Sequence, residues 1–142
     1  MPLMDNVGLP LREALPLMAD TLANHGLKQR VRLIASGKLI TPANVAWALC
    51  AGADFVNAAR GFMFSLGCIQ ALKCNKNICP TGVTTQNVWL QAGIDPQVKS
   101  VRVANYCRNM VREVEMIAHA CGVREPRALG RDHVRIVGSD GL

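Results

Sequence analysis

The sequence predicts an α/β fold in which helices and short strands alternate. Helix-spaced apolar residues and short β-branched runs alternate from residue 11 to residue 66, the loops between them are brief, and glycine or proline stands at the element ends. Strands that alternate with helices through short loops pair in parallel, and a parallel sheet needs helices on both faces. An α/β barrel and a doubly wound sheet are both compatible with this repeat.

The first helix and strand are expected within residues 11–35. Apolar residues recur with helical spacing over residues 11–24, and Gly26 is placed to end that helix in a left-handed conformation. Pro16 leaves the start of this helix open, because proline inside a helix removes a hydrogen bond. The run 31–35 then predicts a short buried strand that stops at Ser36-Gly37.

A second helix and strand follow over residues 41–59. Thr41 is suited to cap a helix and Pro42 to occupy its first turn, so we expect a helix over 43–51 that Gly52 ends. Residues 54–59 predict the second strand. Two parallel strands leave both edges and much apolar surface unpaired, so the chain either docks on more protein or is part of a larger barrel, and we favour the second interpretation.

After the second strand the pattern changes to a short helix, a cysteine-rich loop and a long helix. The short helix is expected over 62–66 and the loop over 67–86. Asp95-Pro96 begins the long helix, and Gly122 ends it. Apolar residues on one face recur at steps of four and three, at Val103, Cys107, Met110, Val114, Ile117 and Cys121. This helix is predicted to cover the fold, Cys50, Cys107 and Cys121 to lie in the core, and the tail 124–142 to be polar and peripheral.

Composition excludes several classes of protein. The 142 residues are 50% hydrophobic and carry a net charge of +6, but the basic residues are dispersed and aromatic residues reach only 4%, which argues against nucleic-acid binding. The most apolar stretch, 45–59, is too short and too polar to span a membrane, and the N-terminus lacks a signal-peptide pattern. We therefore expect a reducing cytoplasmic compartment, in which the six cysteines are thiols or metal ligands.

Three cysteines are the most specific feature of the sequence. Cys68, Cys74 and Cys79 form the pattern C-x5-C-x4-C, and thiolates are the ligands of iron–sulfur centres. Paired C-x2-C motifs, which indicate structural zinc, are absent. The spacing favours an iron–sulfur cluster, and Thr81-Gly82 can offer donors to its sulfurs.

Glycines follow both predicted strands, where an anion can bind. Ser36-Gly37-Lys38 follows the first strand, and Arg60-Gly61 follows the second and precedes the short helix. In α/β barrels the loop after the seventh strand and the helix start after the eighth commonly bind phosphate through backbone N–H groups. Seven residues separate Gly61 from Cys68, about 10 Å of helix at 1.5 Å per residue, so a cluster and a phosphate-bearing cofactor would be neighbours.

These motifs together resemble the glutamate synthase family. The matching runs are Ile34-Ala-Ser-Gly-Lys38, Ala51-Gly-Ala-Asp54, Ala59-Arg-Gly61, Gly67-Cys68 and, through Cys74, Cys79-Pro-Thr-Gly-Val-Thr-Thr-Gln86. They are similar to the C-terminal part of the FMN-binding synthase domain, and most like stand-alone proteins without a glutaminase domain. The resemblance implies one partial domain, 1–142, from a TIM (β/α)8 barrel: the last two βα units over 5–66, an iron–sulfur loop over 67–86 and a covering helix over 95–122.

The resemblance also implies cofactors, partners and a reaction. Cys68, Cys74 and Cys79 would ligate a 3Fe-4S cluster, Gln86 would lie near that loop, and the FMN phosphate would be surrounded by Ser36, Gly37, Lys38, Ala59, Arg60 and Gly61. The family forms 2-iminoglutarate from 2-oxoglutarate and ammonia and reduces it to L-glutamate, with electrons from a donor protein or an NAD(P)H-dependent subunit. The resemblance identifies no catalytic residue here.

Two departures from the family pattern limit this implication. The earlier barrel strands, which supply most flavin-ring and 2-oxoglutarate contacts in the family, have no counterpart, so we expect the chain to be inactive alone. An N-terminal catalytic cysteine is also absent, so glutamine hydrolysis is not expected. Two alternatives stay open: a non-catalytic iron–sulfur electron-transfer or interaction module that docks on a partner barrel, and a colourless zinc-binding scaffold.

Overall fold

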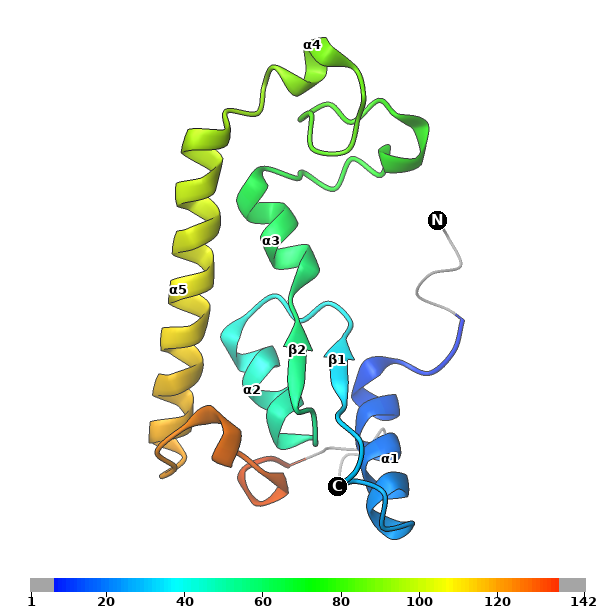
Figure 1. Ribbon diagram of the computed structural model, residues 1–142, viewed down its shortest axis with the longest axis vertical. Coiled ribbons are helices and arrows are strands. Elements are labelled where there is room, and N and C mark those ends of the chain that lie inside the picture. Colours follow the sequence, from blue (N-terminus) through cyan, green and yellow to red (C-terminus); the bar gives the residue numbers. More distant parts are fainter. Residues whose placement is uncertain (1–6, 136–142) are drawn as a thin grey trace.

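The computed structural model describes residues 7–135 and shows an elongated α/β arrangement (Figure 1). Residues 1–6 and 136–142 lie outside the described range, and so do the first two residues of the predicted 5–66 unit and the end of the predicted 124–142 tail. Helix, strand, helix and strand follow in the predicted order. A cysteine-rich loop and a long helix come after them.

The first helix, α1, spans Leu11–Asn24, and the first strand, β1, spans Ile34–Ser36. The helix runs through Pro16, which is buried, so this proline marks neither the start nor the end of α1. Gly26 has a φ of 66°, the left-handed conformation expected at the end of this helix. Strand β1 is shorter than the predicted 31–35 and begins later.

The second pair consists of α2, Pro42–Cys50, and β2, Phe55–Asn57. The Thr41 side chain caps α2 by accepting a hydrogen bond from the backbone N–H of Asn44 at 3.3 Å, as its position predicted. The two strands pair in parallel, with Ile34 opposite Phe55 and Ser36 opposite Asn57. Parallel pairing is confirmed, and it brings the carboxyl ends of both strands to one edge.

The two faces of this sheet differ in burial. Ala35 and Val56 pack against residues of α1 and α2 in the larger core cluster. On the other face Ile34 is 62% exposed and Phe55 is 47% exposed. Helices cover one face of the sheet only, in agreement with the expectation that two parallel strands leave apolar surface unpaired. The prediction of a buried strand over 31–35 is wrong at Ile34.

Two clusters of buried residues form the core. The first joins α1, β1 and α2 through Leu15, Ala35, Leu39, Ala48, Ala51 and Ala53. The second joins α2, the long helix α5 (Pro96–Ala120) and the tail through Ala46, Cys50, Ala118 and Leu129. The tail is therefore not wholly peripheral, since it contributes Leu129, and Arg131 binds Asp20 of α1 at 2.6 Å.

The remaining helices are α3, Ala59–Leu66, α4, Val88–Gln91, and α5, Pro96–Ala120, with short 3₁₀ turns at Cys74–Lys76, Pro126–Ala128 and Arg131–His133. Asp95 caps α5 by accepting from the Gln97 N–H at 2.9 Å. Helix α5 packs along α3 and α2, which confirms the predicted cover. Within the described residues no helix combines the length and the apolar character needed to cross a bilayer.

Three cysteines outside the loop were expected in the core, and one of them is not there. Cys50 is buried and Cys121 is half-buried against the same cluster. Cys107 is exposed, so that prediction is wrong. At this position of α5 the contact with α3 is made by the neighbouring residue Tyr106, whose ring packs against Phe62.

Candidate cofactor and cluster site

The turn after β1 forms one side of a surface groove. Ser36, Gly37 and Lys38 are exposed, and Lys38 adopts a left-handed backbone with a φ of 56°. Together with residues 7–11 and Ala14 they line a cavity of about 430 Å³. The predicted turn therefore borders a hollow at the carboxyl edge of the sheet.

The N-terminus of α3 reaches the same edge, directly after β2. Ala58 is the N-cap residue, and no side chain caps the helix there. The first turn contains Ala59, which is exposed, and Arg60, which is half-buried, and it has no acidic residue. The positive end of a helix dipole and N–H groups without helical acceptors make such a terminus suited to an anion. Ala59, Arg60 and Gly61 do not line the groove formed by Ser36, Gly37 and Lys38.

Gly61 is buried inside the first turn of α3, not in a turn before the helix as predicted. A β-carbon placed on Gly61 would overlap the hydroxyl oxygen and Cζ of Tyr106 from α5. The ring of Phe62 meets the Tyr106 ring edge-on, with 5.0 Å between centroids and 84° between planes. Gly61 is therefore needed for the close packing of α3 against α5. The sequence did not indicate this role.

Tyr106 also contacts the loop beyond β1. Its hydroxyl donates a hydrogen bond to the carbonyl oxygen of Ile40 at 2.8 Å. Burial, and secondarily the neighbouring Cys107, raise the pKa of Tyr106, so the hydroxyl keeps its proton and stays a donor. This contact joins residues 66 positions apart, and no local pattern could have indicated it.

The three loop cysteines line one small cavity at the far end of α3. Cys68, Cys74 and Cys79 border it together with Met63, Pro80 and Thr84. The cavity holds only about 10 Å³. Among the described residues no three Cys, His, Asp or Glu side chains gather as the ligands of one metal ion would. The loop therefore places the three cysteines on one small cavity without gathering their side chains at the spacing of metal ligands.

The surroundings of Cys79 favour the ligand form of its thiol. Cys79 is 7% exposed, and its Sγ lies 3.4 Å from the Thr81 hydroxyl. Hydrogen bonds from that hydroxyl and from the Thr84 backbone N–H lower the pKa of Cys79 to about 6. Metals bind the thiolate form of cysteine, and a pKa of about 6 keeps Cys79 mostly in that form at neutral pH. The Thr84 side chain lines the same cavity, and its hydroxyl also lowers the pKa of Cys79.

Polar contacts that the sequence did not indicate close the loop. The Thr85 hydroxyl donates to the Asn77 carbonyl at 2.6 Å, and the Gln86 N–H donates to the Asn77 side chain at 2.6 Å. Gln91 donates from its side chain to the Thr85 carbonyl at 2.7 Å, which ties α4 to the loop. Gln86 therefore lies beside the cysteine loop, as the resemblance implied. Asn77 has a φ of 58°, a conformation that asparagine tolerates better than most residues.

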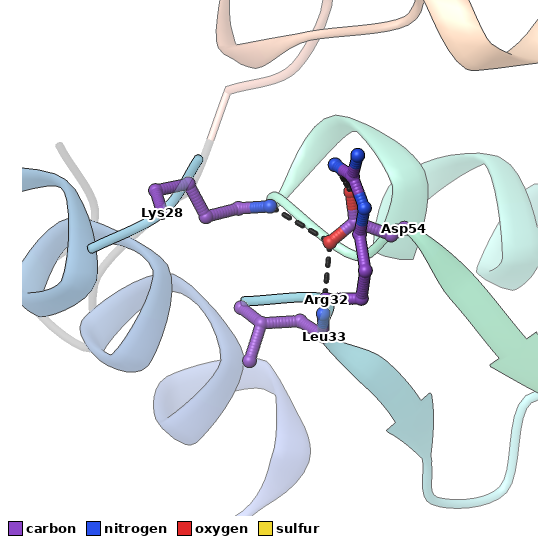
Figure 2. Close-up of polar contacts among 4 residues, drawn as sticks. All are labelled: Lys28, Arg32, Leu33 and Asp54. Atoms are coloured by element: carbon purple, nitrogen blue, oxygen red, sulfur yellow. Dashed lines mark hydrogen bonds and ion pairs between the residues drawn. The ribbon is translucent and has the colours of Figure 1, made fainter. Parts of the chain in front are cut away.

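Asp54 organises the opposite edge of the sheet (Figure 2). Its carboxylate accepts from Lys28 Nζ at 2.8 Å, from the Leu33 N–H at 2.8 Å and from Arg32 at 3.3 Å. Burial opposes the charged form, but these hydrogen bonds and the two cations outweigh it and lower the pKa of Asp54. Asp54 therefore holds the segment before β1 against the start of β2, at the edge of the sheet away from the groove.

Comparison with known proteins identifies the class to which this fold and these motifs belong. Residues 1–124 match the family model described as the conserved region in glutamate synthase. The chain is 44% identical over 139 residues to the glutamate synthase large subunit-like protein YerD of Bacillus subtilis, covering 98% of this chain and 26% of that protein. It is 33% identical over 136 residues to an archaeal glutamate synthase (NADPH) of Methanocaldococcus jannaschii, covering 94% and 27%.

The chain belongs to the glutamate synthase family, a family of oxidoreductases. It spans about a quarter of the length of these relatives. The resemblance drawn from the cysteine and glycine motifs is thereby confirmed.

Proposed function

We propose that this chain is the part of a glutamate-synthase-type oxidoreductase that holds the FMN phosphate and a 3Fe-4S cluster. The observation that carries the proposal is that one short helix, α3, joins the two sites. It begins at the carboxyl edge of the sheet and ends at Gly67, directly before Cys68. The alternation of parallel strands and helices suits the last two βα units of a barrel.

Backbone groups and two cations would hold the phosphate. Ser36 ends β1 and is followed by Gly37 and Lys38, and Ala59, Arg60 and Gly61 lie in the first turn of α3, after β2. The exposed turn can approach an anion closely, Lys38 and Arg60 add positive charge, and the α3 dipole favours negative charge at its start. The absence of acidic residues in the first turn of α3 supports this role.

Cys68, Cys74 and Cys79 would ligate the cluster. All three line one cavity, and hydrogen bonds from Thr81 and Thr84 lower the pKa of Cys79. When bound, the flavin supplies hydride and the cluster supplies single electrons to it. The contribution of this chain is to position both groups and, through Thr81 and Thr84, to tune the cluster by hydrogen bonds.

The reaction of the whole protein is the reduction of 2-iminoglutarate, formed from 2-oxoglutarate and ammonia, to L-glutamate. Electrons would come from a donor protein or an NAD(P)H-dependent subunit, and the relatives named archaeal glutamate synthase (NADPH) support this source. Most flavin-ring and 2-oxoglutarate contacts would come from barrel strands outside this chain. We therefore expect the 142-residue chain to bind cofactors without forming glutamate.

Anaerobic reconstitution with iron and sulfide tests the cluster. We expect brown protein in which iron and acid-labile sulfide occur in the ratio of three to four, and C79S to lose most of the iron. The control C107S removes an exposed cysteine on α5 and should keep the iron. Colourless protein that retains zinc and no iron would refute the cluster, and measurable glutamate formation by the chain alone would refute the expected inactivity.

Titration with FMN and riboflavin tests the phosphate site separately. The two flavins differ in the phosphate, so FMN should shift the backbone amide NMR signals of residues 36–38 and 59–61, and riboflavin should not. Equal shifts with both compounds, or none with either, would remove the phosphate site from the proposal.

A further inference from the structure

We propose that Tyr106 is a positioning residue for the FMN phosphate: it fixes the distance between the two backbone segments that would hold that anion. The inference rests on the proposed function and adds to it a residue from a third element, the long helix α5. Tyr106 contacts the chain just beyond one segment, at Ile40, and the last residue of the other, Gly61.

The first contact is with the loop after β1. The Tyr106 hydroxyl donates to the carbonyl oxygen of Ile40 at 2.8 Å, and Ile40 lies two residues beyond Lys38. Residues 37–40 lie between the end of β1 and the cap of α2, so the ends of this loop are fixed by secondary structure. The hydrogen bond from α5 holds the end of this loop that leads into α2.

The second contact is with the first turn of α3. The hydroxyl and Cζ of Tyr106 occupy the space where any side chain at position 61 would project, and the ring edge packs on Phe62. Only glycine permits this approach, because a methyl group would overlap the ring. The same hydroxyl oxygen therefore touches the α3 N-terminus and bonds to the loop after β1.

A single rigid side chain in both contacts makes the two segments move as one. Strands β1 and β2 pair through Ser36 and Asn57 at this edge, and Tyr106 adds a further connection between the segments that follow them. Losing the hydroxyl would leave the Ile40 carbonyl without this partner and release the loop from α3. Binding of a small anion depends on donors that are already in place. The loss of the hydroxyl should therefore weaken phosphate binding clearly while the fold stays intact.

Y106F tests this role, because it keeps the ring against Gly61 and Phe62 and removes the hydroxyl. FMN binding by the full chain, followed by NMR titration, should weaken about three- to tenfold, the range expected for one hydrogen bond. The control V114A shortens a buried side chain on the same helix and should lower the unfolding midpoint with no change in FMN affinity. Equal losses of affinity in Y106F and V114A would overturn the positioning role, and so would unchanged affinity in Y106F.

A second measurement uses the unaltered chain and does not depend on a variant that folds. Tyr106 is the sole tyrosine of the 142 residues, so a tyrosine labelled with carbon-13 at Cζ gives one NMR signal. FMN and inorganic phosphate should shift this signal, and riboflavin should not. An unmoved tyrosine signal while residues 36–38 respond to FMN would overturn the inference alone. No response to FMN anywhere would overturn the proposed phosphate site and the inference with it.

Discussion

Replacing Asp54 tests how the strand edge opposite the groove is held. D54N keeps the size of the side chain and an acceptor for the Leu33 N–H but removes the charge that faces Lys28 and Arg32. The Lys28–Asp54 pair is 25% and 20% exposed, and a hydrogen bond between charged groups contributes about 1.5–3 kcal/mol. Arg32 is more exposed and adds less than about 1 kcal/mol. We expect D54N to lower the free energy of unfolding by about 1.5–3 kcal/mol.

D54A should cost more than D54N, because it also leaves the Leu33 N–H without its acceptor, which adds about 1–3 kcal/mol. Urea unfolding followed by circular dichroism at pH 7 measures both variants. The matched control is D20N, since Asp20 pairs with Arg131 but is 59% exposed, and its loss should stay below about 1 kcal/mol. Equal losses for D54N and D20N would show that partial burial gives the Asp54 contacts no added strength.

The pH dependence of the same difference follows from the lowered pKa of Asp54. The folded chain binds the Asp54 proton less readily than the unfolded chain, in which the pKa of Asp54 is near 3.8. The stabilisation by the Asp54 charge is therefore fully present above that pH. It is lost as the pH falls through the lower folded pKa. The gap between wild type and D54N should therefore be constant from pH 7 to pH 5 and shrink on further acidification; a gap that is unchanged in strong acid would contradict the assigned charge contacts.

Two other substitutions test the packing of α3 and the closure of the loop. G61A should lower the free energy of unfolding by about 1–3 kcal/mol, because the added methyl overlaps Tyr106. The control G130A places a methyl in open space and should change the free energy by less than about 0.5 kcal/mol. Similar values for both variants would refute the contact between α3 and α5. T85V removes the hydroxyl that bonds to the Asn77 carbonyl and accepts from the Asn87 N–H, so hydrogen exchange at residues 86 and 87 should accelerate by about tenfold. The control T21V removes a hydroxyl that bonds within α1 and should leave that exchange unchanged.

Elements with local signals were predictable from the sequence. Thr41 with Pro42 and Asp95 with Pro96 mark the starts of α2 and α5, because a capping side chain followed by a first-turn proline acts within a few residues. The start of α3 was missed, since Ala58 offers no capping side chain and the helix begins immediately after β2. The exposed sheet face follows from the count of two strands, which was expected to leave apolar surface unpaired, but the apolar run 31–35 did not show that Ile34 lies on that face.

The candidate site likewise has parts that local sequence patterns predict and parts that depend on contacts between distant residues. The cysteine spacing and the two glycines that follow the strands are local patterns, so the sequence indicated them and the family they belong to. The bond from Tyr106 to Ile40 and the closure of the loop by Asn77 and Thr85 depend on the folded chain. Gly61 shows how the two levels interact: the sequence marked it as special, and the structure adds that its missing side chain makes room for Tyr106.

Thiol alkylation of the chain, with and without prior reconstitution by iron and sulfide, tests the central claim most directly. Cys74 and Cys107 are both exposed, so iodoacetamide should modify both in the untreated chain, as peptide mass spectrometry can record. After reconstitution Cys68, Cys74 and Cys79 should be protected together, while Cys107 reacts at its original rate. Modification of Cys74 at the same rate before and after reconstitution would contradict a cluster held by these three cysteines.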